Sequence, residues 1–293
     1  MKIIQTFAIF DEVSPYLTNK RNFEYVYLNF YSFILSYITI KKIYGPITMI
    51  CNQEAYDAFI KYIPYDEIII KKNENDFKMW AKYKLDSIGL FNEDLIHVDS
   101  DVIIFDDHFK PFIGDDYDIM VQNILPRKMN FVRDFGYNQK EFLENTKILT
   151  KSFDGKCFSC GVLGLKKNVL KYYLKGVDVL HEEMNKIGVE KFNCATMILE
   201  EQLLYFIAQE NNFKFYGIIP ESEISHNDDI IKYGDKIGYV HLWFGLKFKR
   251  DVIQMIRNKL FYDYPEYLNY VIKYEKEIMS NKKIFEYVVL SNS

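Results

Sequence analysis

The sequence predicts a mixed α/β fold, in which a mainly parallel sheet is flanked by helices and followed by a C-terminal helical tail. Short apolar runs alternate with longer helical patterns, and this alternation is typical of a parallel sheet covered by helices on both faces. One apolar run near the middle is followed at once by acidic residues, as at the carboxyl edge of an open sheet. Two further helical patterns close the chain after residue 250.

The first third of the chain alternates between strand and helix patterns. Residues 2–10 form an apolar run that predicts a strand, and residues 22–44 predict a long helix that Gly45 and Pro46 end. The next expected elements are a strand, a helix, a strand and a helix, at residues 47–51, 54–62, 67–71 and 77–89. Gly89 can cap the last of these helices.

The middle of the chain begins with Leu95–Val98, which predicts a strand that is apolar except for His97. Two more strands are expected at residues 118–122 and 160–165, and the polar segment 125–153 between them predicts a loop or lid. The later elements are expected to be two helices, a strand and two surface helices, at residues 169–187, 199–211, 213–219, 251–260 and 265–279.

The domain organisation follows from what the sequence lacks. It contains no internal repeat and no linker rich in Pro, Gly or Ser, so we expect one domain over residues 1–250 and a helical extension over 251–293. The tyrosines of this extension could pack on the domain, on a partner chain or at a membrane surface that holds an acceptor lipid. Packing on the domain is preferred, because their spacing follows no helical period.

The balance of charge excludes one class of function. The 37 basic and 41 acidic residues give a net charge of −4, and no strongly basic block is present. Nucleic-acid binding by neutralisation of phosphates is therefore not expected. A mildly acidic enzyme can still bind an anionic substrate if a metal ion supplies the local positive charge.

The sequence favours a cytoplasmic protein. It has no run of about 18 uncharged apolar residues, so no transmembrane helix is expected, and the apolar run at its start is too short for a signal peptide. The four cysteines, Cys51, Cys157, Cys160 and Cys194, are too few and scattered for a disulfide framework. Cys157 and Cys160 form a CxxC pair, but no second ligand pair follows, so neither zinc nor redox chemistry is expected there.

Asp99 and Asp101 are the most informative residues. They follow the strand Leu95–Val98 and are two positions apart, so both carboxylates can face the same side of an extended segment. Two such carboxylates repel each other unless a cation lies between them, and their oxygens suit Mg²⁺ or Mn²⁺. The same pattern also fits two acids that merely end a strand in a polar turn.

A family resemblance covers the surrounding segment. Residues 84–112, KLDSIGLFNEDLIHVDSDVIIFDDHFKPF, resemble nucleotide-sugar transferases with the GT-A fold, a Rossmann-like α/β fold, and especially the glycogenin-like and lipopolysaccharide-galactosyltransferase-like family. That family has a helix with a lysine, then a strand, a DxD motif, an apolar triplet and an acidic-aromatic turn. The resemblance implies that Asp99 and Asp101 hold Mn²⁺ or Mg²⁺ and that Ser100 contacts a nucleotide-diphosphate sugar.

The resemblance also assigns a lysine to the donor. Lys84 lies 15 residues before Asp99 and matches the family lysine that approaches the donor diphosphate or sugar. Lys78 and Lys82 are nearby alternatives, and each of these lysines could instead be a solvated residue on a helix face. In the family, the first strand holds the nucleotide base, and Thr6, Phe7 and Ala8 could occupy that place.

Two later stretches agree with the family and appear in its order. Residues 158–163, FSCGVL, resemble the F-N-S-G-V strand that lines the sugar pocket, and Gly161 would allow close approach of the backbone. Glu201 and Gln202 resemble a D-Q pair at the start of a helix. A carboxylate there could contact donor or acceptor hydroxyls, and it could equally stabilise the helix N-terminus.

A third stretch resembles the H-x-x-G-x-x-K signature near the end of the family's fold. In HLWFGLK the resemblance makes His241 the third metal ligand and Lys247 a contact to the diphosphate. Gly245 lies four residues after His241 instead of three, whereas Lys247 keeps the spacing of six. This departure puts the roles of Gly245 and Lys247 in question.

Together these residues predict a glycosyltransferase that moves a sugar, expected to come from a UDP-sugar, to a glycan, lipid or protein acceptor. The resemblance implies retention at the anomeric carbon. An inverting enzyme would need a carboxylate base, and Glu200 or Glu201 could serve.

Two alternatives to a glycosyltransferase remain. One is a phosphatase of the haloacid dehalogenase type with later acids at Asp228 and Asp229, although Ile103 stands where such enzymes have Thr or Val. The other is a non-catalytic nucleotide- or carbohydrate-binding protein.

Overall fold

The computed structural model describes residues 1–10, 23–74, 79–105, 116–125, 156–188, 195–223, 233–234 and 236–278. The chain forms two compact units. The first consists of Met1–Ile4, Glu74–Asp99 and His108–Gly238, and the second of Gln5–Asn73, Ser100–Asp107 and Tyr239–Ser293. The predicted division at residue 250 stays a prediction.

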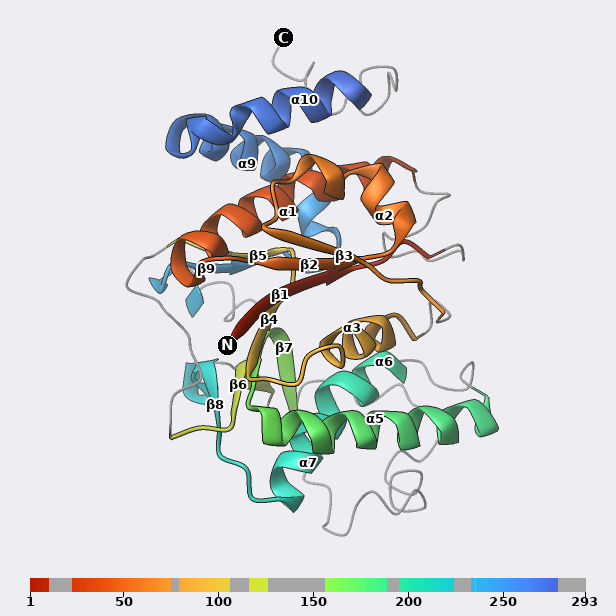
Figure 1. The fold of residues 1–293 in the computed structure, drawn as a ribbon. Helices are drawn as coiled ribbons and strands as arrows, with labels where there is room; N and C mark the ends of the chain where they lie inside the picture. The colour runs from red at the N-terminus through yellow and green to blue at the C-terminus, as the bar shows by residue number, and fades with distance from the viewer. Residues whose placement is uncertain are drawn as a thin grey trace. The chain divides into compact units, whose positions relative to one another are not determined.

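The central sheet confirms the predicted fold class. Its seven strands follow the order β3-β2-β1-β4-β7-β6-β8, and helices flank it (Figure 1). The pairs β1–β4, β2–β3 and β6–β8 are parallel, whereas β7 runs antiparallel to both β4 and β6. The seven strands are β1 (Lys2–Phe7), β2 (Thr48–Cys51), β3 (Glu67–Ile70), β4 (Leu95–Val98), β6 (Ile119–Leu125), β7 (Cys157–Leu165) and β8 (Phe215–Ile219).

The first unit is built around β4 and β7, which are buried at every position. A strand that is buried on both faces carries an almost continuous apolar run, as Leu95–Val98 does. The helical elements of this unit include α3 (Trp80–Ile88), α5 (Lys167–Ile187), α6 (Ala195–Met197), η5 (Ile198–Gln202), α7 (Leu203–Glu210) and the short turn η6 (Glu221–Glu223). Helices α5 and α7 pack together, and both η5 and α7 pack against β7.

The second unit is built around α1 (Phe23–Tyr44), with β2 and β3 beside it. Its other elements are α2 (Gln53–Ala58), η1 (Ile60–Tyr62), β5 (Val102–Ile104), β9 (Tyr239–His241), η7 (Phe244–Phe248), α9 (Arg250–Asp263), η8 (Pro265–Tyr267) and α10 (Leu268–Ile278). Strands β5 and β9 form a separate antiparallel pair, in which Val102 lies opposite His241. Helix α1 packs on β5, η7 and α9.

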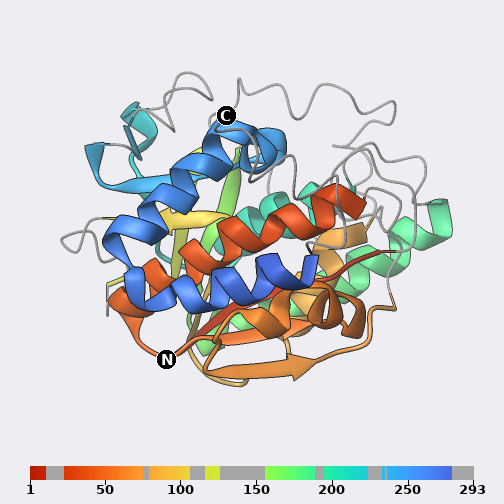
Figure 2. The same ribbon diagram turned by 90° about the horizontal axis from the view of Figure 1, so that it is seen from above.

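The C-terminal helices pack on α1, within the second unit. Tyr274 of α10 is fully buried, stacks on Phe30 with 3.8 Å between ring centroids, and donates a hydrogen bond to the carbonyl oxygen of Tyr27. Glu275 accepts from Tyr31 at 3.0 Å and pairs with Arg257 at 2.9 Å. Figure 2 shows α10 alongside α1. Tyr274 therefore packs on α1, whereas Tyr262 and Tyr270 of the same extension are exposed.

Most predicted elements are confirmed, and the differences follow from local structure. Strand β7 begins at Cys157 instead of residue 160, and β6 reaches Leu125, because the two strands pair over this length. The helix expected at 54–62 is divided into α2 and η1 by Phe59. Strand β5 was not expected. The segment expected to be a loop or lid, residues 125–153, lies outside the described residues after Leu125.

One difference concerns the site. The helix expected to start at residue 199 already includes Ala195, so Glu200, Glu201 and Gln202 do not form a first turn. They belong to η5, a π-helical segment that is followed directly by α7. Glu201 therefore does not stabilise a helix N-terminus, which was the structural alternative to a role in binding donor or acceptor hydroxyls. Single π-helical turns within α-helices are frequent at functional sites.

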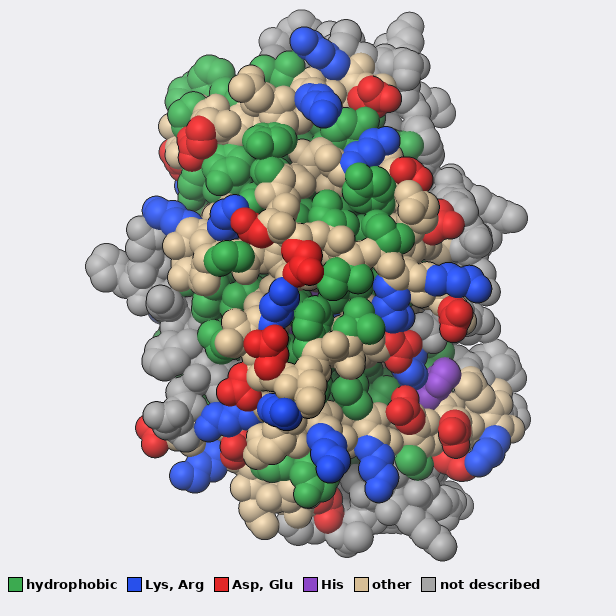
Figure 3. Space-filling model, viewed as in Figure 1, with side chains coloured by type: hydrophobic (Ala, Val, Ile, Leu, Met, Phe, Trp, Pro, Cys, Tyr) green, Lys and Arg blue, Asp and Glu red, His purple; other side chains and the backbone are tan. Residues whose placement is uncertain are grey.

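Side chains of both charges occur on one face of the molecule. Among the described side chains on the face shown in Figure 3, Lys and Arg are interspersed with Asp and Glu. Within the described ranges, no helix combines the length and the apolar character needed to cross a bilayer.

Candidate active site

Asp99 follows β4, at the carboxyl end of that strand in the first unit. Its backbone N–H donates to the carbonyl oxygen of Gly161 at 2.8 Å, which continues the pairing of β4 with β7 by one residue. The backbone of Asp99 is therefore fixed by the sheet, while its side chain remains 30% exposed. Polar side chains that follow a buried strand in this way lie where open α/β sheets bind ligands.

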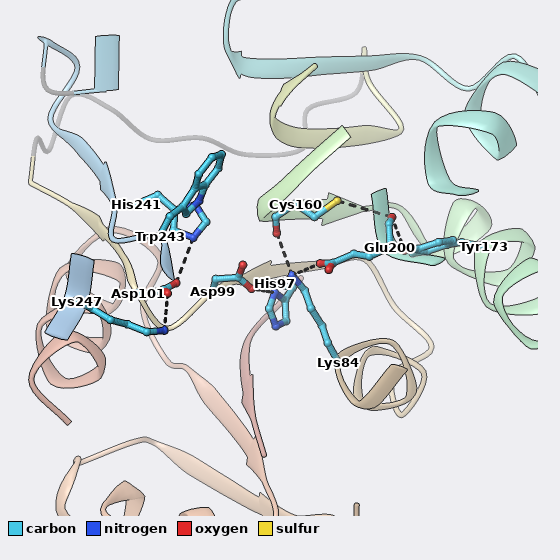
Figure 4. Close-up of polar contacts among 10 residues, drawn as sticks. All are labelled: Lys84, His97, Asp99, Asp101, Cys160, Tyr173, Glu200, His241, Trp243 and Lys247. Carbon is cyan, nitrogen blue, oxygen red and sulfur yellow. Dashed lines mark hydrogen bonds and ion pairs between the residues drawn. The ribbon is translucent and has the colours of Figure 1, made fainter. Parts of the chain in front are cut away.

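Lys84 of α3 joins Asp99 to Glu200 of η5. Its ammonium group lies 2.8 Å from Asp99 Oδ1 and 2.5 Å from Glu200 Oε1, and it donates to the carbonyl oxygen of Cys160 at 3.0 Å (Figure 4). All three donor positions of the ammonium group are thus used. The Lys84 side chain is 5% exposed, so it is a buried cation held between two carboxylates and not a solvated lysine.

Electrostatics keep this lysine charged and a neighbouring histidine neutral. Burial alone would lower the pKa of Lys84, but Asp99 and Glu200 raise it well above its usual range. His97 is fully buried in β4, with Nδ1 3.6 Å from Asp99 Oδ1. Burial, and then the charge of Lys84, hold the pKa of His97 well below its usual value. We therefore treat His97 as neutral near Asp99.

Asp101 is the centre of a second cluster, within the second unit. His241 Nε2 lies 3.2 Å from its Oδ1, and Lys247 Nζ lies 2.8 Å from its Oδ2. The backbone contributes as well, since Leu242 N–H donates to the carbonyl oxygen of Asp101 at 2.9 Å. Burial would raise the pKa of Asp101, but Lys247 and His241 hold it well below its usual range.

The pairing of β5 with β9 brings these residues together. Val102 follows Asp101 and lies opposite His241, so the ladder places the histidine beside the carboxylate. Lys247 belongs to η7, which begins three residues after His241. Trp243 Nε1 donates to His241 Nδ1, and the two rings meet edge to face. The ring of His241 is therefore oriented with Nε2 toward Asp101 (Figure 4).

Chain connectivity links the two clusters. Asp99 and Asp101 are separated only by Ser100, so their Cα atoms can be no more than about 7 Å apart. Asp99, Asp101 and His241 form a group of the kind that could hold a metal ion. Two ligand atoms at right angles around an ion with bonds of about 2.1 Å lie roughly 3 Å apart. The 3.2 Å between His241 Nε2 and Asp101 Oδ1 is close to this separation. Because Nδ1 accepts from Trp243, a neutral His241 carries its proton on Nε2 and donates it to Asp101. A metal ion at Nε2 would replace that proton, which would have to leave or move to Nδ1.

The remaining predicted donor-binding residues occupy varied environments. Ser100 is buried, and its hydroxyl has no hydrogen-bond partner among the described residues. Gly161 lies in β7, where its carbonyl oxygen accepts from Asp99. Gly245 is exposed in η7, and a Cβ there would meet no described atom within 4 Å, so packing does not require a glycine.

The predicted base-binding residues lie at the end of β1. Thr6 is half-buried within the strand, and Ala8 is buried just after it. Asn52 fixes the next residue by pairing with both backbone groups of Ile9, accepting at 3.1 Å and donating at 2.8 Å. A role of Thr6 and Ala8 in binding the base stays a prediction.

Glu201 and Gln202 share the π-helical segment with Glu200. Gln202 is buried, and one carboxylate oxygen of Glu201, Oε2, is buried with no hydrogen-bond partner among the described residues. Burial first, and then repulsion by Glu200, raise the pKa of Glu201 well above its usual value. A hydroxyl group that donated to the buried oxygen of Glu201 would satisfy it.

We expect Glu201→Gln to raise the free energy of unfolding at pH 7.5 by about 1 kcal/mol. Because the folded state has the higher pKa, ionisation of Glu201 opposes folding. The wild type should therefore lose stability as the pH rises from the unfolded value of about 4.3 through the raised pKa. Urea unfolding at pH 5 and pH 7.5 measures this, with the exposed Glu223→Gln as control. A variant that is less stable than wild type at pH 7.5 would contradict the expectation.

Sequence reasoning left three contributors out of the predicted site. Glu200 was considered only as a base for an inverting enzyme, yet it binds Lys84. His97 was the single polar residue of an apolar strand, and this was a usable signal. Trp243 lies two residues from His241, but nothing in the sequence shows that its indole N–H donates to that imidazole. The second run of acids, Asp228 and Asp229, lies outside the described residues.

Three of the four cysteines lie among the described residues. Cys51, Cys157 and Cys160 are buried free thiols, and burial raises the pKa of each, to about 12 for Cys51. Raised thiol pKa values disfavour the reactive thiolate. Cys194 lies outside the described residues.

Comparison with known proteins places the chain in a family. The model of a "Family of unknown function (DUF6734)" matches residues 1–274, so the chain belongs to this family. A search of curated proteins found no match.

Solved structures similar to this chain include two glycosyltransferases and a cytidylyltransferase. The galactosyltransferase LgtC, in complex with donor and acceptor sugar analogs, has a TM-score of 0.37 at 11% identity, over 74% of this chain and 73% of its own. A glycosyltransferase involved in glycosylation of the major capsid of PBCV-1 has a TM-score of 0.41 at 10% identity, over 88% of this chain and 100% of its own. A cytidylyltransferase from Leptospira borgpetersenii has a TM-score of 0.39 at 11% identity, over 97% and 95%. At these TM-scores the likeness is distant.

Proposed function

We propose that this chain is a metal-dependent glycosyltransferase that moves a sugar from a nucleotide-diphosphate sugar, a UDP-sugar in the first instance, to a glycan, lipid or protein acceptor. One observation carries the proposal. Asp101 contacts both His241 and Lys247, the two residues that the family resemblance assigns to the metal and to the diphosphate. A polar turn that merely ended a strand would not need two partners from so far along the chain.

Asp99, Asp101 and His241 would hold Mn²⁺ or Mg²⁺. Two carboxylates and an imidazole offer the oxygen and nitrogen ligands that such a site uses, and the three side chains could form one group. When bound, the ion supplies positive charge that stabilises the departing nucleoside diphosphate.

The other residues of this proposal act by position and charge. Lys247 lies beside Asp101 and is partly exposed, so it could face a diphosphate without rearrangement of solvent. Lys84 already uses its three donor positions, so it would offset the charge of the leaving group from behind Asp99, without contacting the diphosphate. The strand around Gly161, with Glu201 and Gln202, would shape the sugar and acceptor pockets. Retention at the anomeric carbon is part of the proposal and rests on the family resemblance.

Stabilisation by a nucleotide sugar that requires Mn²⁺ tests the proposed function. UDP-, GDP-, dTDP- and CMP-sugars are compared by thermal shift and calorimetry, with and without Mn²⁺, on the wild type and on Asp101→Asn. We expect one nucleotide class to stabilise the wild type only with Mn²⁺, and Asp101→Asn to lose that stabilisation because a ligand carboxylate becomes a neutral amide.

Asp178→Asn is a matched control, because Asp178 is 69% exposed and lies outside both clusters. It should respond to donor and Mn²⁺ as the wild type does. Absence of any nucleotide binding in the presence of metal would remove the main support for a transferase, and phosphatase assays would follow. Binding of a donor without turnover over many acceptors would indicate a non-catalytic binding protein.

A cytoplasmic location and a single catalytic domain over residues 1–250 belong to the same proposal. The free thiols of Cys51, Cys157 and Cys160 support a reducing compartment. The packing of α10 on α1 supports a structural role for the helical extension.

A further inference from the structure

The π-helical segment η5 has a side-chain partner in α5. Leu203 N–H donates to the carbonyl oxygen of Ile198, five residues earlier, which is the hydrogen bond of a π-helix. The hydroxyl of Tyr173 donates to the carbonyl oxygen of Glu200 at 2.8 Å and lies 3.2 Å from that of Leu199. Cys160 Sγ lies 3.9 Å from the same Glu200 oxygen. Two buried side chains thus contact the backbone where the helix widens.

These contacts matter because a π-helical turn decides where Glu200 points. The turn contains one residue more than the same length of α-helix, so loss of the turn would rotate the preceding side chains by about 100°. In the structure Glu200 points to Lys84, with 2.5 Å between Oε1 and Nζ. Rotation of this size would separate the carboxylate from the ammonium group.

Glu200 in turn changes the net charge that a metal ion would meet at Asp99 and its neighbours. Lys84, Asp99 and Glu200 together carry one negative charge, because a single cation is shared by two carboxylates. Without Glu200 beside it, Lys84 would neutralise Asp99 alone. An approaching divalent cation would then meet a neutral pair, and its attraction to Asp99 would weaken.

We infer that Tyr173 is a positioning residue, which holds the π-helical turn so that Glu200 shares Lys84 with Asp99 and leaves Asp99 negative enough to bind a divalent cation. This inference rests on the proposed metal site, and it adds Tyr173 and Glu200 to the residues on which that site depends. Tyr173 is fully buried in α5 and would touch neither the metal nor a substrate. Its effect passes through backbone geometry and one carboxylate.

The test uses Tyr173→Phe, Glu200→Gln and the control Tyr172→Phe on the full chain. Tyr172 is the neighbouring residue of α5, is 52% exposed and loses the same atom on substitution. Hydrogen exchange of residues 198–205 reports on the turn, and calorimetric titration with Mn²⁺ alone reports on the site. We expect Tyr173→Phe to accelerate exchange at least about tenfold and to weaken Mn²⁺ binding about three- to tenfold, a loss of up to about 1.4 kcal/mol.

Glu200→Gln separates the turn from the carboxylate. It should weaken Mn²⁺ binding as much as Tyr173→Phe does while exchange of residues 198–205 stays at the wild-type rate. Tyr172→Phe should change neither quantity. Unchanged Mn²⁺ affinity in Glu200→Gln overturns the inference even if Tyr173→Phe fails to fold, and unchanged exchange in a folded Tyr173→Phe overturns it as well.

A double-mutant cycle distinguishes failure of this inference from failure of the proposed function. If the wild type binds no Mn²⁺, the proposed metal site fails, and the cycle between Tyr173→Phe and Glu200→Gln then decides the positioning role by urea unfolding. If the double variant's unfolding equilibrium constant differs by more than about twofold from the product of the two single effects, the positioning role is supported. Substitutions at distant, independent sites change the free energy of unfolding additively within that margin. Additive effects overturn that role.

Discussion

Replacement of Lys84 by methionine is expected to lower the free energy of unfolding at pH 7.5 by about 3–5 kcal/mol. Methionine keeps most of the side-chain volume but removes the cation between Asp99 and Glu200, which lie 2.8 Å and 2.5 Å from it. Glu200 is then left buried, charged and without its cation. Urea unfolding, followed by circular dichroism, measures the loss.

The pH dependence of this loss identifies its cause. Without Lys84, the ionised form of Glu200 is buried with no cation beside it, and protonation of this carboxylate would relieve the penalty. The loss of stability should therefore shrink as the pH falls from 7.5 toward the pKa of an unfolded glutamate, about 4.3. A deficit that stays constant between pH 7.5 and pH 5 would point to lost packing instead of an unpaired charge.

Lys82→Met is the matched control for Lys84→Met. Lys82 lies two residues earlier in α3 and pairs with Asp86 and, at 3.5 Å, with the exposed Asp178. Lys82 is itself buried, but Asp86 and Asp178 reach solvent and can be hydrated once the lysine is gone, so the loss should be clearly smaller than for Lys84→Met. Equal effects of the two substitutions would show that Lys84 is no more than an ordinary residue of the helix.

The second large effect is expected at Lys247. Under the proposed function, Lys247→Met should lower the rate of sugar transfer about 10²- to 10³-fold, because it would remove the cation that we propose to face the leaving diphosphate. If the lysine acts mainly in the transition state, kcat should fall and KM should change little. Steady-state kinetics with the donor found in the nucleotide screen, at saturating Mn²⁺, measures both constants.

Lys249→Met controls for a change of net charge near the end of η7. Lys249 is exposed. Its substitution should leave kcat and KM within about twofold of wild type, because a solvated charge contributes little to the electrostatic potential at the site. A rise in KM alone for Lys247→Met would mean that the lysine only binds the donor. Unchanged kinetics would remove Lys247 from the proposed machinery.

Local sequence pattern was sufficient to predict most elements and to single out Asp99 and Asp101 as candidates for a site. Apolar runs bounded by Gly, Pro or acids predicted β4 to the residue and α1 and α5 closely, because burial and backbone chemistry act over a few neighbouring residues. The spacing of Asp99 and Asp101 at the end of such a strand indicated a cation site for the same reason. Family resemblance, not pattern, linked His241 and Lys247 to them.

The tertiary structure decided which charges meet, because contacts between distant residues leave no trace in local pattern. It showed that Lys84 is buried between Asp99 and Glu200, and that β5 pairs with β9 so that His241 reaches Asp101. It also moved Glu200 from a helix start into a π-helical turn held by Tyr173. Sequence alone determined which residues could carry the chemistry, and three-dimensional packing determined their partners and therefore their charge.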